Sequence, residues 1–149
     1  MEGLDVGAGT LLSSDDVRDA KAAGATFGVS PGATSELIEA CDGAKLPFLP
    51  GAASPSEVVN LLSLGFEVQK FFPAEAAGGT TMLRAIAGPM RQVKFCPTGG
   101  ISPKNVSDYL ALENVVCVGG SWIAPRNLIS EKAWDKITEN ARIASALGQ

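Results

Sequence analysis

The sequence contains no histidine in 149 residues. This absence excludes Ser-His-Asp triads, Cys-His dyads, histidine metal ligands and histidine general bases. Cysteine is also scarce, since only Cys41, Cys96 and Cys117 are present and none stands in a C-x-x-C spacing. An odd number of cysteines with this spacing argues against a disulfide framework or a zinc site. We therefore expect reduced thiols in a cytoplasmic protein, and no metal.

Long apolar stretches and basic runs are absent as well. No stretch approaches the ~20 apolar residues of a membrane span, and the first residues carry neither the cationic nor the apolar region of a signal peptide. Lysine and arginine total 12 against 16 acidic residues, a net charge of −4. Because such a chain is poorly suited to polyanions, we expect neither nucleic acid nor a membrane as a partner.

The composition is that of a globular domain. Hydrophobic residues make up 46% and charged residues 19% of the chain, which argues against disorder. A chain of this length buries roughly 70% of the surface that its unfolded form exposes, so it needs no disulfide or metal for stability. We expect a single domain over residues 1–149.

A short apolar run, a turn with glycine or proline and a helix-like segment recur six times. Ser54, Pro55 and Glu57 combine an N-cap, a proline at the first helical position and a glutamate that reaches back to the cap. Regular alternation predicts parallel strands joined by crossover helices. The expected strands are residues 4–9, 26–30, 47–49, 68–72, 93–97 and 115–119. The expected helices begin near residues 13, 34, 54, 82, 102 and 130.

Two architectures fit this alternation, an open doubly wound sheet and a (β/α) barrel of the TIM type. The loop after each expected strand carries glycine, proline or both, and six marked loops on one rim favour the barrel. An eight-fold barrel typically needs ~250 residues. We therefore expect an α/β fold with about six of the eight strand–helix units of a TIM-type barrel, the first two units being absent.

Lys70 stands within the apolar run VQKFFP. Strand alternation places it on one face with Val68 and Phe72. Burial between apolar side chains disfavours the ammonium and lowers the lysine pKa, and a neutral lysine attacks carbonyl carbons to form a Schiff base. The alternative is a strand-end lysine that reaches solvent or pairs with Glu67 or Glu75.

Two glycine-rich turns follow the last two expected strands, at residues 98–100 and 119–121. Such turns leave backbone N–H groups uncovered, and a following helix N-terminus adds a positive dipole, a combination that binds phosphate. If the absent units precede this chain, the turns follow strands seven and eight, where barrels often bind phosphate. The alternative is glycine that serves only a tight turn.

Four other residues carry weaker signals. Thr10 ends the first expected strand and is suited to a ligand carboxylate or to a turn. Glu75 shares the rim with Lys70 and is suited to proton transfer, to charge balance or to a solvated loop. Cys96 is more typical of a small buried side chain than of a nucleophile. Trp122 either lines the rim or packs against a neighbouring subunit.

Three runs together resemble the 2-keto-3-deoxy-6-phosphogluconate (KDPG) and 4-hydroxy-2-oxoglutarate (KHG) aldolases. They are KFFPAE from Lys70, FCPTGGI from Phe95 and VGGSW from Val118. VGAGT from Val6 and the Ser-Pro-Gly from Ser30 fit the earlier strands of the family, so the resemblance covers nearly the whole chain. It implies a (β/α)8 barrel that is commonly a trimer and that uses neither a metal nor an organic cofactor.

The resemblance makes Lys70 the Schiff-base lysine of a class I aldolase, a carbon–carbon lyase. Its substrate is a phosphorylated 2-keto acid, cleaved to pyruvate and glyceraldehyde 3-phosphate. Thr10 and Thr98 would contact the pyruvyl end, with Phe72 packed beside it. The residues implied to hold the substrate phosphate are Gly99, Gly100, Gly120 and Ser121.

The sequence departs from the family at one feature. The general acid/base glutamate of the family lies in a Leu-Glu-Val-Thr-like run on the second strand, followed by an arginine that binds the keto acid carboxylate, and no such run occurs here. We expect weakened aldolase activity, with Glu75 as the candidate substitute for proton transfer. Two other functions fit the same motifs: a non-catalytic phosphosugar-binding or oligomerising remnant, and one half of a split aldolase.

Overall fold

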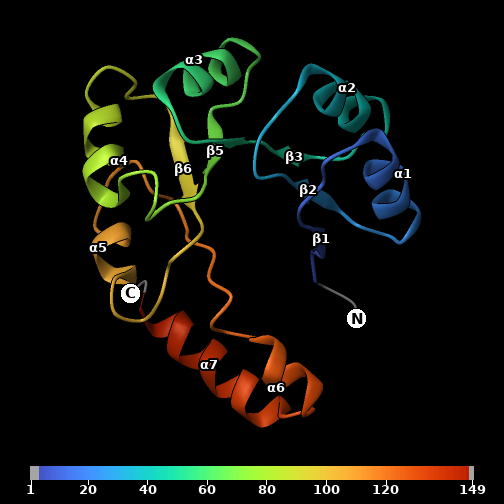
Figure 1. Cartoon of the computed structure of the whole chain (residues 1–149), viewed down its shortest axis with the longest axis vertical. Coiled ribbons are helices and arrows are strands. Elements are labelled where there is room, and N and C mark those ends of the chain that lie inside the picture. Colours follow the sequence, from blue (N-terminus) through green and yellow to red (C-terminus); the bar gives the residue numbers. More distant parts are fainter. Residues whose placement is uncertain (1–3, 148–149) are drawn as a thin grey trace.

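The computed structural model describes residues 4–147, which form six strands and seven helices (Figure 1). The strands are β1 (Gly7–Ala8), β2 (Phe27–Val29), β3 (Phe48–Leu49), β4 (Gly51–Ala52), β5 (Val68–Phe71) and β6 (Lys94–Pro97). The helices are α1 (Ser14–Ala22), α2 (Ser35–Gly43), α3 (Pro55–Ser63), α4 (Gly79–Ala87), α5 (Val106–Leu110), α6 (Arg126–Ser130) and α7 (Trp134–Ala146).

The strands form two parallel sheets, in the orders β1-β2-β3 and β4-β5-β6. Strands β3 and β4 belong to one extended segment that is interrupted at Pro50, whose ring nitrogen has no hydrogen to donate to a ladder. The Pro50 carbonyl still accepts the N–H of Lys70 at 2.8 Å. The first sheet thus ends at β3 and the second begins at β4, directly after Pro50. All strand pairs are parallel, which confirms the predicted α/β fold.

The expected strand over residues 115–119 is wrong as a continuous strand. Only two isolated bridges form, Phe95 with Val115 and Thr98 with Gly119. The offset between partners grows from 20 to 21 residues between these bridges, so one extra residue interrupts the ladder. Val116 lies in the interruption and is 54% exposed. The strands that the structure describes form open sheets and no closed barrel.

Helix starts with a capping side chain are confirmed. Ser13, Thr34 and Ser54 each accept a hydrogen bond from a backbone N–H of the first turn of α1, α2 and α3. The helix expected from residue 102 begins only at Val106, because the Asn105 side chain accepts the Ser102 N–H at 2.8 Å and holds the intervening residues in a turn. Helix α4 begins three residues before the expected start, α7 begins after residue 130, and α6 was not expected.

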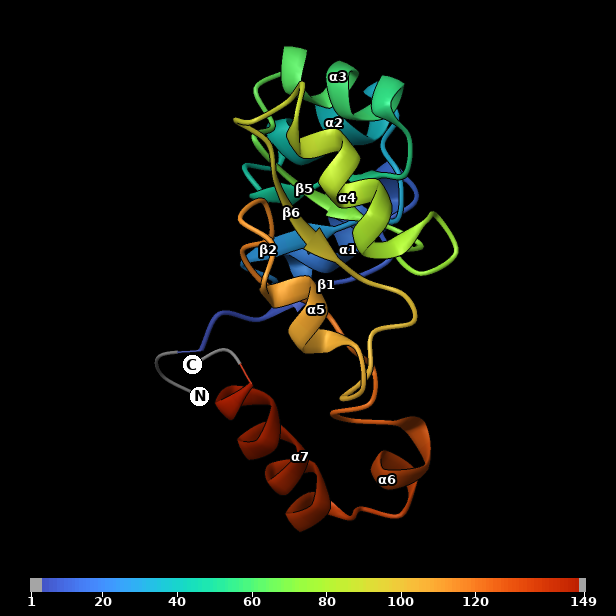
Figure 2. The ribbon, with the colours of Figure 1, turned by 90° about the vertical axis from the view of Figure 1, so that its left-hand side faces the viewer.

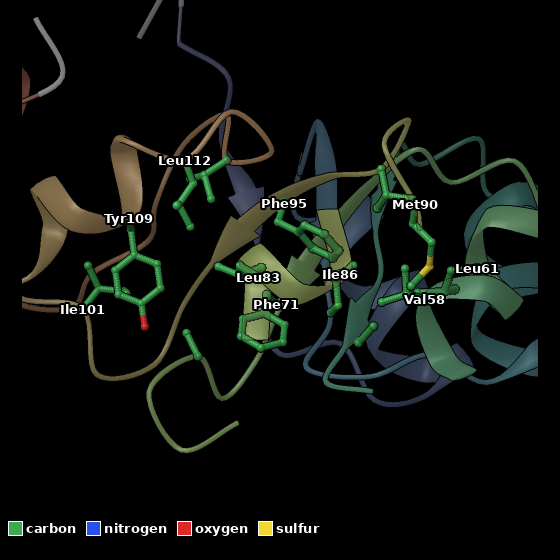
Figure 3. Packing of buried hydrophobic residues seen from close by; sticks show 14 of the residues in the cluster. Val58, Leu61, Phe71, Leu83, Ile86, Met90, Phe95, Ile101, Tyr109 and Leu112 are labelled. Atoms are coloured by element: carbon green, nitrogen blue, oxygen red, sulfur yellow. The ribbon is translucent and has the colours of Figure 1, made fainter. Parts of the chain in front are cut away.

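The buried hydrophobic residues form two clusters. The smaller one joins α1 and α2 to the first sheet. The larger one joins β5 and β6 to α3, α4 and α5, and Figure 3 shows Phe71 and Phe95 of the sheet facing Leu83 and Ile86 of α4. The rings of Phe71 and Phe95 pack edge to face, with centroids 6.1 Å apart. These contacts cover one face of β5 and β6 with helices and fix the position of both strands.

Helices α6 and α7 extend away from the body formed by the strands and α1–α5 (Figures 1 and 2). Neither helix has a buried residue. Trp134, the first residue of α7, is 56% exposed. Among the helices of residues 4–147, none has both the length and the apolar character needed to cross a membrane.

Candidate active site

Lys70 lies on β5, between Gly51 of β4 and Cys96 of β6 in the parallel register. Its half-buried position lowers the pKa of the amine through desolvation, and nearby Cys96 opposes this shift in part. The nitrogen lies 4.8 Å from the centre of the Phe72 ring. Among residues 4–147 it forms no ion pair, so the structure does not support the pairing with Glu67 or Glu75.

The neighbours of Lys70 along the strand determine which way it faces. Gln69 and Phe71 are completely buried against the helices. The Gln69 amide donates to the carbonyls of Val58 and Phe66 at 3.1 and 2.9 Å, which fixes the register of β5 against α3. Because side chains alternate along a strand, Lys70 and Phe72 face the opposite side, away from the helices.

Thr98 follows β6 on the same face as Cys96 and therefore as Lys70. Its hydroxyl is buried and, within the described part of the chain, has no hydrogen-bond partner. A buried hydroxyl without a partner costs free energy unless another group satisfies it. The sheet thus brings a lysine amine, an aromatic ring and an unpaired hydroxyl onto one surface.

The glycine turn after β6 is fixed through its carbonyl groups. The carbonyls of residues 98–100 each accept one hydrogen bond, two from backbone N–H groups and one from a side-chain amide. The donors, in order, are Ala74, Glu75 and Asn105, at 2.8, 3.1 and 3.1 Å. All three carbonyls are therefore directed into the protein, and the turn is held by the loop after β5 and by the segment before α5.

The N–H groups of the same turn remain available. Gly99 and Gly100 have positive φ angles of 95° and 84°, a conformation that glycine adopts without strain. The N–H groups of Gly99, Gly100 and Ile101 donate to no acceptor in the region from residue 4 to 147. Successive uncovered N–H groups of this kind form a concave site for an anion.

The second glycine turn lies directly beside the first. Gly119 donates its N–H to the Pro97 carbonyl at 2.9 Å, and a methyl group added at Gly119 would lie 2.6 Å from Cγ2 of Thr98. Ser121 follows on the surface. Asn140 of α7 donates to the Trp122 and Ile123 carbonyls at 3.2 and 3.1 Å, which ties the segment after Ser121 to the last helix.

Two of the expected site residues lie apart from this surface or face another way. Thr10 lies two residues after β1, and β2 and the β3–β4 segment separate β1 from β5. Thr10 has a φ of 63°, which is strained for a residue other than glycine. Glu75 lies on the rim, but its carboxylate accepts a hydrogen bond from the hydroxyl of Tyr109. The structure thus brings Lys70, Phe72 and Thr98 together with the two glycine turns.

Three residues that bear on this surface were not predicted from the sequence. Asn105 and Tyr109 hold the first glycine turn or its neighbour, and their partners are known only once the chain has folded. Cys117 lies beside Cys96, and interaction with this thiol lowers the pKa of Cys117 to about 7. The interaction with Cys117, together with burial, raises the pKa of Cys96. The one signal in the sequence was the tyrosine itself, because the hydroxyl of a buried tyrosine needs a hydrogen-bond partner.

Comparison with known proteins identifies the class. Residues 1–140 match the family model of the KDPG and KHG aldolases. The chain is 48% identical over 139 residues to the KHG/KDPG aldolase of Escherichia coli K12, and 46% identical over 141 residues to the 2-dehydro-3-deoxy-phosphogluconate aldolase of Pseudoalteromonas atlantica. These matches cover 93% and 95% of this chain, but only 65% and 66% of the respective relatives.

Solved structures agree with the sequence comparison. The KDPG aldolase of Legionella pneumophila, with pyruvate captured as a covalent carbinolamine, has a TM-score of 0.91 at 49% identity and aligns over 95% of this chain and 69% of its own. The KDPG aldolase of Zymomonas mobilis with 3-phosphoglycerate has a TM-score of 0.88 at 42% identity, over 99% and 69%. The relatives are thus aldolases, which are carbon–carbon lyases. The chain belongs to the KDPG and KHG aldolase family, and it spans about 65% of the length of the curated relatives that it matches.

Proposed function

We propose that this chain carries the Schiff-base site of a class I aldolase that cleaves KDPG to pyruvate and glyceraldehyde 3-phosphate. The observation that carries the proposal is the half-buried amine of Lys70, which has a lowered pKa and lies on one surface with Phe72 and Thr98. A neutral amine is the form that attacks a carbonyl carbon. The covalent carbinolamine of pyruvate in the Legionella relative supports the same chemistry.

In the proposed reaction the Lys70 nitrogen attacks the C2 carbonyl of the 2-keto acid, and the carbinolamine loses water to give a protonated Schiff base. The bond between C3 and C4 then breaks. Its electron pair moves towards the iminium nitrogen, which leaves the enamine of pyruvate, while the proton of the C4 hydroxyl departs and the aldehyde is released. Protonation at C3 and addition of water return pyruvate and the free amine, so the water lost first is consumed last.

The phosphate of the substrate is assigned to the two adjacent glycine turns. The uncovered N–H groups at Gly99 and Gly100 support this assignment, and Gly120 and Ser121 extend the same rim. The chain has a net charge of −4, so binding of an anion must rely on such local N–H groups rather than on a general positive field. The Zymomonas relative with 3-phosphoglycerate is consistent with a phosphorylated ligand.

The other end of the substrate is assigned to Thr98 and Phe72, with Thr10 as a further contact. The unpaired hydroxyl of Thr98 supports a hydrogen bond to the pyruvyl group. For Thr10 the support is its strained backbone in the loop after β1. Glu75 is proposed to transfer the proton at C4. For this step its carboxylate has to leave the Tyr109 hydroxyl during the reaction.

We also propose the domain, the oligomeric state and the compartment in which this site works. We take residues 1–149 as one part of a TIM-type (β/α) barrel domain, supported by the TM-scores of 0.91 and 0.88 to full KDPG aldolases. We propose a homo-oligomer, a trimer by analogy with the family, that acts on a phosphorylated 2-keto acid in the cytoplasm. The three unpaired cysteines support a reducing compartment.

Reductive trapping tests the proposal directly. The purified chain is incubated with pyruvate and sodium borohydride, and the intact mass and the modified peptide are then measured. We expect a single reduced pyruvate adduct on Lys70, absent from Lys70→Arg and retained in Lys104→Arg, whose lysine is exposed. A folded wild-type chain without an adduct on Lys70 contradicts the proposal.

A further inference from the structure

We propose that Tyr109 is a positioning residue for the phosphate end of the site, acting through its hydrogen bond to Glu75 on the glycine turn of residues 98–100. The inference rests on the proposed function, because it takes this turn as the phosphate site. Tyr109 contacts neither the Lys70 amine nor the N–H groups of the turn, and its one polar partner within residues 4–147 is Glu75. Its contribution is to hold in place the residue on which the turn rests.

Tyr109 and Glu75 connect two loops of the rim. Glu75 belongs to the loop between β5 and α4, and Tyr109 to α5, which follows the glycine turn. The ring of Tyr109 is 1% exposed and packs in the larger hydrophobic cluster. Figure 3 shows the ring beside Ile101, with its hydroxyl directed away from Leu112. Burial and the carboxylate together raise the pKa of Tyr109, so the hydroxyl keeps its proton and remains a donor to Glu75.

Glu75 supports the glycine turn at two points. Its backbone N–H donates to the Gly99 carbonyl at 3.1 Å. Its aliphatic stem lies against Gly100, where an added methyl group would be 2.5 Å from Cγ and 2.8 Å from Cβ of Glu75. The stem therefore occupies the space that any side chain at position 100 would need. Glycine at this position is required both by its φ of 84° and by the stem of Glu75.

Gly79 leaves room for the hydrogen bond itself. A methyl group added there would lie 3.3 Å from the Tyr109 hydroxyl and 3.5 Å from the carboxylate of Glu75. Gly79 also has a positive φ of 58°. The start of α4 thus passes close to the pair without blocking it. Gly79 and Gly100 leave room for the carboxylate and the stem of Glu75, and the buried hydroxyl of Tyr109 holds the carboxylate by a hydrogen bond.

The consequence for an anion is preorganisation. The carbonyls of the turn are held inward, which leaves its N–H groups aimed at the open side before any ligand arrives, and groups held in advance lose less entropy on binding. The same hydrogen bond keeps the carboxylate of Glu75 turned towards α5. Without the tyrosine hydroxyl, an exposed negative charge beside the anion site is free to move, and it opposes the phosphate.

Two measurements on the full chain test the inference: the Kd of 3-phosphoglycerate by calorimetry, and the rate of pyruvate trapping on Lys70. Tyr109→Phe keeps the ring and removes only the donor. We expect it to weaken 3-phosphoglycerate binding about threefold to tenfold, the usual effect of one lost hydrogen bond, with the trapping rate changed less than about twofold. Glu75→Gln keeps the stem and an acceptor for Tyr109, so it should bind at least as tightly as the wild type, whereas Glu75→Ala should bind more weakly.

Each other outcome has a distinct meaning. If Glu75→Gln weakens 3-phosphoglycerate binding as much as Glu75→Ala does, keeping an acceptor for Tyr109 makes no difference and the positioning role is overturned. If Tyr109→Phe lowers the Tm but leaves the Kd unchanged, the pair is purely structural. Ser54→Ala, far along the chain at the start of α3, controls for a loss of stability alone. A wild type that binds no 3-phosphoglycerate or forms no adduct counts against the proposed function instead.

Discussion

The amine of Lys70 lies 4.8 Å from the centre of the Phe72 ring. The same ring borders the first glycine turn, since a methyl group added at Gly99 would be 3.2 Å from Cδ2 of Phe72. One aromatic side chain therefore contacts both the proposed nucleophile and the proposed anion site. The ring packs against one side of the amine. Its face attracts the ammonium, whereas the burial to which the ring contributes favours the neutral amine, and burial is the main cause of the lowered pKa of Lys70.

This relationship predicts how trapping by pyruvate depends on pH. The rate should rise with pH as Lys70 loses its proton, with a midpoint below the ordinary lysine pKa of 10.5. Phe72→Ala lets water reach the amine and moves the midpoint upward. At pH 7 its rate should fall about twofold to tenfold, because each unit of pKa changes the neutral fraction about tenfold. Phe72→Leu keeps an apolar cover and should change less. Equal midpoints in the wild type and Phe72→Ala would contradict this argument.

Local signals in the sequence were sufficient for part of this arrangement. The alternation around Lys70 predicted its face, because a period of two needs no knowledge of distant residues. The capping residues Ser13, Thr34 and Ser54 predicted three helix starts, since each cap acts within one turn of the chain. The glycine turns were also evident, because few residues other than glycine adopt a positive φ without strain.

The remaining features depend on contacts that no local pattern contains. Tyr109 and Glu75 are 34 residues apart in the chain, so their hydrogen bond exists only after β5, β6 and α5 have packed. Residues 115–119 have the apolar pattern of a strand, but a ladder needs a partner in register, and here an extra residue interrupts the pairing with β6. The Asn105 side chain accepts the Ser102 N–H and holds residues 102–105 in a turn, so α5 begins only at Val106.

Gly100→Ala should destabilise the chain by about 1–3 kcal/mol, because it forces a side chain into a positive φ. It also places a methyl group 2.5 Å from Cγ of Glu75. The matched control is Gly43→Ala at the end of α2, where an added methyl group meets nothing within 4 Å. Because alanine favours helix over glycine, the control should be stabilised by up to about 1 kcal/mol. Urea unfolding measures both, and a Gly100→Ala chain as stable as the control would show that the turn adapts.

Cys117 should be the cysteine that reacts first with iodoacetamide. The neighbouring Cys96 thiol lowers the pKa of Cys117 to about 7, so its thiolate fraction rises steeply across neutral pH. Cys41 is buried, and desolvation raises the pKa of its thiol. Cys96→Ala removes the neighbouring thiol and should slow alkylation of Cys117 at pH 7 about tenfold, with the midpoint moved towards 9. Cys41→Ala, measured in parallel by peptide mass spectrometry, should leave the rate unchanged. A midpoint that stays near 7 in Cys96→Ala would exclude the thiol pair as its cause.

The start of α3 predicts a stability effect that depends on pH. The carboxylate of Glu57 accepts hydrogen bonds from the N–H groups of Ala53 and Ser54 and from the Ser54 hydroxyl. The hydrogen bond from the Ala53 N–H and, to a smaller extent, the one from the Ser54 hydroxyl lower the pKa of Glu57 below its ordinary value of 4.5. A carboxylate whose pKa is lowered by folding stabilises the protein above its unfolded pKa and loses this contribution as the pH falls through the folded pKa.

Ser54→Ala should therefore cost about 0.5–2 kcal/mol at pH 7, the usual effect of losing an N-cap. The difference between wild type and Glu57→Gln should be largest at neutral pH and shrink as the pH falls below 4.5, where the wild-type carboxylate gains its proton. Urea unfolding at pH 7 and pH 3 measures this, with Glu36→Gln as the control, since Glu36 lies in the first turn of α2 without a capping role in that helix. A difference between wild type and Glu57→Gln that stays constant with pH would mean that the charge of Glu57 does not stabilise the cap.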